Sequence, residues 1–122
     1  MTASSGLRIL SLADLPNPGS REFKIERAQW PLYGFVVRKG DVIAAYLNRC
    51  PHAGHPLNLR PDKFFTPDEA LLMCNSHGAL FEPESGRCVA GPCTGKALVR
   101  IPIRVEGDEV LLDVSEEELQ RL

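Results

Sequence analysis

Apolar and polar residues alternate along several short stretches of the chain, and this period of two is typical of half-buried β-strands. The longest alternation covers residues 99–105, where every second position is valine or isoleucine and Pro102 indicates an edge or irregular strand. Helical periods are few, so the pattern predicts a mainly β protein. The other predicted strands cover residues 7–12, 23–26, 32–38, 42–47, 70–73 and 110–114.

Turn-forming residues are expected to connect these strands into antiparallel hairpins. A Lys-Gly-Asp turn at 39–41 lies between the two longest continuous β-forming stretches and predicts the clearest hairpin of the first half. Residues 58–69 hold two prolines and mixed charges, which indicates a surface loop with one helical turn. Ser115 and Glu118 have the spacing of a capping box, so a short helix is expected to end the chain at Leu122.

The composition agrees with one folded domain covering residues 1–122. Of the 122 residues, 43% are hydrophobic and 25% charged, which argues against a disordered chain. The net charge is −2, so no basic excess indicates nucleic acid or an anionic membrane as a partner. No apolar run approaches the roughly 20 residues of a membrane span, and the first residues lack the pattern of a secretory signal. We therefore expect a soluble protein in the cytoplasm.

Two short motifs combine cysteine with histidine, and each follows a predicted strand. The first is Cys50-x-His52 and the second is Cys74-x-x-His77. Thiolate and imidazole at such tight spacing indicate a metal site. Zinc accepts two cysteines and two histidines in a tetrahedral site, whereas a two-iron cluster can take both cysteines on one iron and both histidines on the other. The spacing alone leaves both metals open.

The residues around these motifs resemble the Rieske iron–sulfur family. The resemblance covers about residues 23–114, which is most of the chain. It rests on the two ligand motifs, on the glycines, prolines and aromatic residue that follow them, and on a later Gly-Pro loop. The matching positions are Cys50, His52, Gly54, Pro56, Leu57, Cys74, His77, Gly78, Ala79, Phe81, Gly86, Gly91 and Pro92.

The resemblance implies a [2Fe–2S] cluster held by Cys50 and Cys74 on one iron and by His52 and His77 on the other. It implies a Rieske-like antiparallel β-sandwich, with a small cluster-binding subdomain at about residues 48–95 that is built from two loops. The family's proline loop would cover the cluster, and Pro92 lies at its position.

Several further residues are expected next to the cluster. Gly54 and Gly78 are predicted to let the backbone approach the sulfur atoms and donate N–H groups to them. His55 is expected in a surface position of the first loop. Cys88 and Cys93 are predicted to be small buried residues near the cluster, with a redox-active pair as the alternative.

Three aromatic predictions concern the rest of the chain. Trp30 and Tyr33 are expected to fill the core. Phe64 and its neighbour Phe65 are expected to anchor their loop by packing, with an exposed docking patch as the alternative.

Four positions indicate a low reduction potential. High-potential members of the family have a cysteine in each ligand loop, joined as a disulfide, where this chain has His55 and Ser76. Those members also place serine and tyrosine hydroxyls where this chain has Ala79 and Phe81. Because hydrogen bonds to the sulfurs raise the potential, we expect the low end of the Rieske range, near about −150 mV.

The histidine count argues against an oxygenase in this chain. The mononuclear iron of such enzymes needs two histidines and a carboxylate, but the chain has three histidines and the cluster would take two. No Gly-x-Gly-x-x-Gly motif predicts a nicotinamide or flavin site. The expected function is therefore that of a non-enzymatic, ferredoxin-type carrier that passes one electron from a reductase to a terminal enzyme such as an oxygenase.

Two alternatives remain beside this carrier. One is a structural or interaction module stabilised by zinc. The other is the Rieske-like small subunit of a larger oxidoreductase, such as assimilatory nitrite reductase, although that subunit often lacks the ligands that are all present here.

Overall fold

The computed structural model describes residues 7–51, 54–75 and 78–122. In this part of the chain, ten short strands form three antiparallel sheets, with one 3-10 helix, η1 (Leu12–Asp14), and one α-helix, α1 (Glu116–Arg121). The mainly β class with a short terminal helix is as predicted. The central sheet is ordered β2 (Gly19–Ile25), β3 (Leu32–Lys39), β4 (Val42–Leu47), β8 (Arg100–Ile101). The second is ordered β1 (Arg8–Ser11), β10 (Glu109–Leu112), β9 (Ile103–Glu106), and the third β5 (Leu72–Met73), β6 (Leu80–Phe81), β7 (Cys88–Ala90).

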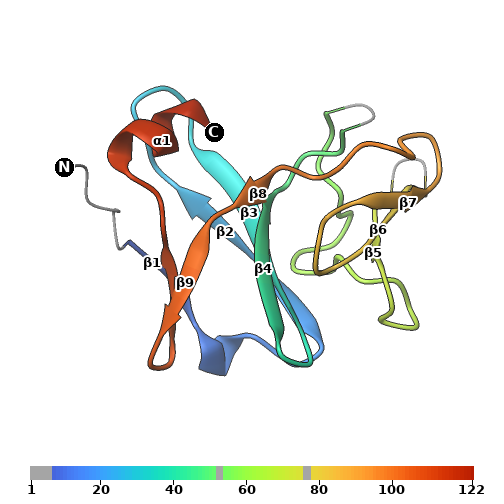
Figure 1. The fold of residues 1–122 in the computed structure, drawn as a ribbon, viewed down its shortest axis with the longest axis horizontal. Coiled ribbons are helices and arrows are strands. Elements are labelled where there is room, and N and C mark those ends of the chain that lie inside the picture. Colours follow the sequence, from blue (N-terminus) through green and yellow to red (C-terminus); the bar gives the residue numbers. More distant parts are fainter. Residues whose placement is uncertain (1–6, 52–53, 76–77) are drawn as a thin grey trace.

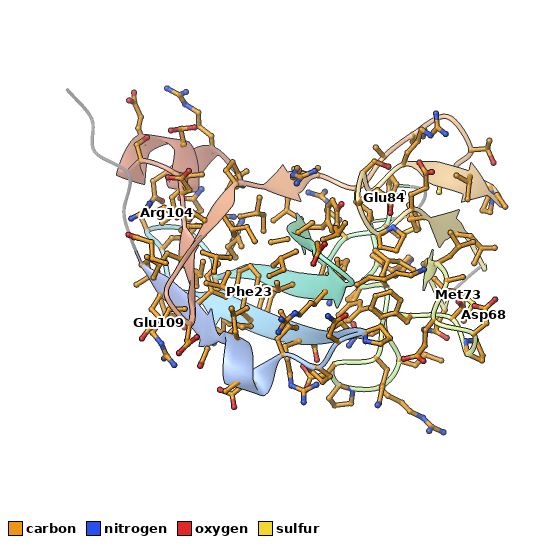
Figure 2. The ribbon with its side chains drawn as sticks, turned by 60° about the horizontal axis from the view of Figure 1, so that its bottom comes forward. Phe23, Asp68, Met73, Glu84, Arg104 and Glu109 are labelled. Carbon is orange, nitrogen blue, oxygen red and sulfur yellow. The ribbon has the colours of Figure 1, made fainter. Side chains whose placement is uncertain are left out.

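The third sheet lies at the end of the molecule opposite α1, with the central sheet between them (Figure 1). Figure 2 shows the same division from another side, with Arg104 and Glu109 at one end and Met73 and Asp68 at the other. The small sheet and the loops around it thus form a separate part of the structure.

The β3–β4 hairpin is buried on both of its faces. Phe35 and Val37 of β3 lie in one hydrophobic cluster, whereas Val36 between them lies in another. All three are fully buried. Since successive side chains of a strand point to opposite faces, the hairpin separates two cores. The turn is the predicted one, and Gly40 takes a positive φ of 62° there.

Different elements enclose each of the two cores. One lies between the central sheet and the β1-β10-β9 sheet, and Leu119 of α1 helps to close it. The other lies under the small sheet and includes Phe64, whose ring stacks on Phe35 with a centroid distance of 4.0 Å and an interplanar angle of 9°. Such a pair contributes about 0.5–1.5 kcal/mol beyond its buried area. Phe64 therefore anchors its loop, as predicted.

Pro102 divides the strand that was predicted for residues 99–105. β8 ends at Ile101 and pairs with β4, whereas β9 begins at Ile103 and pairs with β10. Proline has no N–H to donate to a ladder, and the Pro102 carbonyl accepts a hydrogen bond from the Asp113 amide at 2.9 Å. The chain changes sheets at this residue, so the prediction of one continuous strand is wrong.

Two other predictions are corrected. Trp30 and Tyr33 are 73% and 56% exposed, so they do not fill the core. Tyr33 alternates with the buried Leu32 and Gly34 at the start of β3, where the outward face meets solvent. Residues 58–69 contain turns and one β-bridge but no helical turn. The capping box of α1 is confirmed, since the Ser115 hydroxyl accepts from the Glu118 amide and the Glu118 carboxylate accepts from the Ser115 amide.

Tyr46 connects the central sheet to the small one. Its hydroxyl donates to the Pro83 carbonyl at 2.7 Å, and burial raises the pKa of this phenol to about 12. Gly86 has φ of +76°, and a Cβ at this position would lie 2.6 Å from Tyr46 Cε1. The glycine is therefore needed for its backbone conformation and for the space that the tyrosine ring occupies.

We expect Gly86→Ala to lower the free energy of unfolding by about 1–2 kcal/mol for the left-handed backbone and by about 1–3 kcal/mol more for overpacking against Tyr46. Gly107→Ala is the control, because Gly107 has φ of +60° but no atom within 4 Å of an added Cβ. Urea unfolding of both variants measures the difference. If both variants lost the same free energy of unfolding, the contact of the added Cβ with Tyr46 would have no cost.

Candidate metal centre

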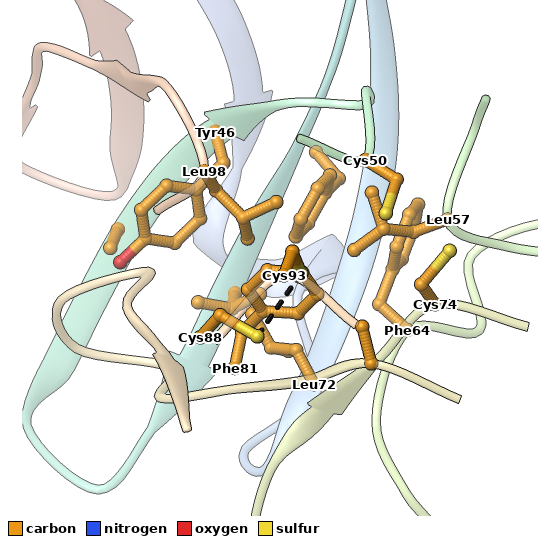
Figure 3. Close-up of a cluster of buried hydrophobic side chains, with 14 residues drawn as sticks. Tyr46, Cys50, Leu57, Phe64, Leu72, Cys74, Phe81, Cys88, Cys93 and Leu98 are labelled. Carbon is orange, nitrogen blue, oxygen red and sulfur yellow. Dashed lines mark hydrogen bonds between the residues drawn. The ribbon is translucent and has the colours of Figure 1, made fainter. Parts of the chain in front are cut away.

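Cys50 and Cys74 lie at the same edge of the hydrophobic cluster under the small sheet. Cys50 follows β4 and Cys74 follows β5, and they are only 2% and 0% exposed. Figure 3 shows both side chains next to Leu57. All four cysteines of the chain are described, and none of them forms a disulfide. The fold thus brings together two thiols that are 24 positions apart in the sequence.

The two cysteine loops share one backbone frame. In each, the cysteine amide donates to the carbonyl five residues later, at 2.7 Å for Cys50 and 2.9 Å for Cys74. The glycine amide four residues after the cysteine donates back to the cysteine carbonyl, at 2.7 Å for Gly54 and 2.9 Å for Gly78. Both glycines have positive φ, +75° and +72°, which costs glycine little. Their amides donate within the loops, so these glycines serve to form the turns.

The backbone of Leu57 holds the two loops together. Its amide donates to Asn48 Oδ1 at 2.8 Å. Its carbonyl accepts from the Asn75 amide at 2.8 Å and from Asn75 Nδ2 at 3.2 Å. Asn48 also donates to the Asn58 side chain at 2.9 Å. The sequence analysis did not single out these asparagines, although an asparagine within two positions of each cysteine, at 48 and 75, was the available signal.

A third loop packs against the second cysteine loop. Gly91 has φ of +96°, and a Cβ there would lie 2.8 Å from the Ala79 Cα. Pro92 is exposed at the surface of this loop. The loop is therefore in direct contact with the segment that follows Cys74, and its role as the cover of the cluster stays a prediction.

Cys88 and Cys93 are buried below this loop, as predicted. The Cys93 thiol donates to Cys88 Sγ at 3.1 Å, and the Cys88 thiol donates to the Ala90 carbonyl at 3.2 Å. Burial raises the pKa of the Cys93 thiol to about 12, and its interactions with the thiols of Cys88 and Cys50 add to the shift. Cys93 is therefore a protonated thiol at neutral pH, next to Cys50.

The predicted histidine ligands, His52 and His77, lie outside the described residues, as does Ser76. Among the residues that are described, no three metal-ligating side chains gather at one place. Of the other predicted neighbours of the cluster, Gly54, His55, Gly78 and Pro92 are all exposed. The described part of the candidate site therefore consists of Cys50 and Cys74 with the loops that carry them.

The chemistry of this part fits an iron–sulfur cluster. Two buried thiols without a disulfide provide the sulfur ligands that such clusters require, and backbone hydrogen bonds in the described parts of both loops help to position them. Among the described residues, Ala79 and Phe81 are fully buried and carry no hydroxyl, the Tyr46 hydroxyl donates to the Pro83 carbonyl, and the Thr94 hydroxyl of the third loop donates to the Gly91 carbonyl.

Two cysteine loops with a common backbone frame, and a third loop against the second of them, are compatible with the class of iron–sulfur domains. Residues 7–111 match the model of the Rieske [2Fe-2S] domain, so the chain belongs to the Rieske family. No curated protein matches the sequence significantly. The described residues also contain no helix of the length and hydropathy that a membrane span requires.

Solved structures of Rieske proteins have the same fold. The ferredoxin of carbazole 1,9a-dioxygenase from Nocardioides aromaticivorans IC177 is 25% identical, with a TM-score of 0.68, and the alignment covers 89% of this chain and 97% of that one. The Sphingomonas yanoikuyae B1 ferredoxin is 19% identical, with a TM-score of 0.70 and coverages of 89% and 98%. The terminal oxygenase of carbazole 1,9a-dioxygenase from Novosphingobium sp. KA1 is 21% identical, with a TM-score of 0.74, and this chain covers 31% of it.

Family membership decides between the two metals that the spacing left open. The cofactor of a Rieske domain is a [2Fe–2S] cluster, so a zinc module is no longer the alternative. The cluster exchanges one electron at a time, which makes the chain an electron-transfer protein of the Rieske type.

We expect Asn48→Ala to lower the free energy of unfolding by about 1–3 kcal/mol, because the buried Leu57 amide loses its acceptor. Asn48→Asp is the matched control, since it keeps an oxygen at the acceptor position. Urea unfolding should rank the stabilities as wild type, then Asn48→Asp, then Asn48→Ala. If the alanine variant were as stable as the aspartate variant, the Asn48–Leu57 bond would not stabilise the first loop.

Proposed function

We propose that this chain is a low-potential Rieske-type ferredoxin that carries one electron from a reductase to a terminal oxygenase or a similar enzyme. The observation that carries the proposal is the alignment with the ferredoxin of a carbazole dioxygenase, at 25% identity over 97% of that chain. The cytoplasmic location stays a prediction.

The proposed ligands are Cys50 and Cys74 for one iron, and His52 and His77 for the other. Support comes from the burial of both cysteines in one cluster and from the common frame of their loops. When bound, the cluster supplies the one-electron couple. The protein's part is to hold it, to exclude water with the third loop, and to set its potential through the neighbouring donors.

The ligand assignment is tested by substitution. Cys50→Ala and Cys74→Ala should lose the cluster, because each removes one of two thiolates from the same iron. His52→Cys and His77→Cys should retain a cluster in some form but lose the Rieske spectrum, because histidine ligation distinguishes Rieske clusters from all-cysteine ones. Iron analysis, visible absorption and EPR of the reduced protein measure both effects. His55→Ala is the control, since this exposed third histidine is not a proposed ligand, and its spectrum should stay unchanged.

The proposed potential lies near about −150 mV, the low end of the Rieske range. The absence of hydroxyls at Ala79 and Phe81 supports it, as does the bond that holds the Tyr46 hydroxyl on Pro83. An EPR-monitored redox titration measures the midpoint, and Ala79→Ser should shift it upward by restoring a donor. A wild-type midpoint above about +100 mV would contradict the low-potential assignment.

The carrier role itself is tested by electron stoichiometry. A reductive titration should consume one electron for each chain, and the reduced protein should support turnover when supplied to a ferredoxin-dependent Rieske oxygenase. Purification of the native protein as a stable complex with a large catalytic chain would instead identify it as the small subunit of a larger oxidoreductase.

A further inference from the structure

Acidic residues are absent from the three loops of the candidate metal centre. Residues 48–61, 74–81 and 85–97 contain none of the 16 aspartates and glutamates of the chain, although they contain four of its 14 lysines and arginines. The chain as a whole has a net charge of −2. The sign of the charge on these loops is therefore opposite to that of the whole molecule.

Three of these four basic side chains have no ion-pair partner among the described residues. The fourth, Arg87, pairs with Glu82 at 3.3 Å. Arg49, Arg60 and Lys96 are exposed, and none of the ion pairs found in the described part of the chain includes them. Their charges are thus available to a partner.

Arg49 and Lys96 are tied closely to the metal centre. Arg49 directly precedes Cys50, and its Nε lies 3.8 Å from the position of an added Cβ on Gly54, so the side chain lies along the first cysteine loop. Lys96 belongs to the third loop, where its amide donates to the Cys93 carbonyl and its carbonyl accepts from the Cys88 amide, both at 2.9 Å.

A hollowed surface of mixed polar and apolar side chains lies beside Arg49. Two adjoining hollows of about 380 and 190 Å³ share Tyr33, Asn48 and Pro56 in their walls. Leu59, which is 80% exposed, lines one of them, and Arg49 lines the other. Glu22 is the acidic residue in the walls of these hollows. Exposed tyrosine and leucine next to an arginine that has no ion pair within the described part of the chain is a composition found at protein interfaces, in which tyrosine and arginine are enriched.

We propose that these three loops form a docking face for a redox protein whose contacting surface is acidic, with Arg49 and Lys96 as its main charges and the Tyr33–Leu59 surface as its apolar part. This inference rests on the proposed function, since it concerns the partner that exchanges the electron. At ionic strengths where the Debye length is about 10 Å, an approaching protein responds to the local positive field rather than to the net charge.

The experiment follows the oxidation of the reduced, cluster-containing protein by two inorganic complexes in a stopped-flow instrument. Tris(oxalato)cobaltate(III) is the anionic oxidant and tris(phenanthroline)cobalt(III) the cationic one. Each takes one electron from the protein as Co(III) becomes Co(II). The rate constant for the anionic oxidant should fall about tenfold as salt is raised from low to high ionic strength. A tenfold change is the low end of the range for electrostatic steering of association rates. The rate constant for the cationic oxidant should rise.

A charge-matched pair of variants localises the effect. Arg49→Glu with Lys96→Glu should abolish or reverse the fall in rate with the anionic oxidant. Arg8→Glu with Arg121→Glu makes the same change in net charge on β1 and α1, away from the small sheet (Figure 1), and should leave the salt dependence as in the wild type. Poly-L-glutamate, as a carboxylate probe, should slow the anionic reaction of the wild type at least twofold and that of the loop variant not at all.

Two results would overturn the docking face. One is a wild-type rate with the anionic oxidant that rises with salt, as the net charge of −2 alone would give. The other is an equal response of the two double variants. Either result is obtained on protein that carries its cluster, so it is distinct from a failure of the proposed function, which would appear as a missing Rieske spectrum.

Discussion

The two-sided burial of the β3–β4 hairpin is the constraint on which the rest of the structure depends. Val36 and Ala45 belong to one core, and Phe35 and Tyr46 belong to the other. The first core stabilises the sheets, and the second is the base on which the metal-centre loops rest. Burial of a large apolar side chain contributes about 1.5–3 kcal/mol, so the ring of Phe35 stabilises the site directly. The loops keep their positions because the hairpin beneath them belongs to both cores.

Backbone hydrogen bonds shape the described parts of the two cysteine loops. Their shape comes from backbone hydrogen bonds that are repeated in both, from glycines with positive φ, and from the asparagines on either side of Leu57. These hydrogen bonds use backbone and asparagine atoms, so the charged side chains of the loops, which are all basic, take no part in them. In the proposed docking face, cofactor binding and partner recognition would therefore use different atoms of the same segments, since the first needs buried thiols and the second exposed cations.

Local pattern predicted most of the elements, because the hairpin, the terminal helix and the turns depend on neighbouring residues. It failed where distant contacts decide. The strand predicted for residues 99–105 is divided at Pro102, because each half pairs with a different sheet. β6 and β7, only two and three residues long, give too short a pattern to be predicted. Tyr33 is an aromatic residue in a strand rich in β-formers and was therefore predicted to be buried, but its outward position on β3 leaves it in solvent.

The sequence by itself determined that the chain has a metal site, because two motifs combine cysteine with histidine at tight spacing. The spacing left zinc and a two-iron cluster open, and the match of residues 7–111 to the Rieske domain decided for the cluster. The sequence also determined that no acidic residue lies in the three loops. Only the tertiary structure decided that Cys50 and Cys74 share one buried edge, that Leu57 holds their loops together, and that Arg49 and Lys96 form no ion pair within the described residues. The physical reason is that a motif specifies which side chains are present. The burial of these side chains and their ion pairs depend on residues that are distant in the chain and come into contact only in the folded protein.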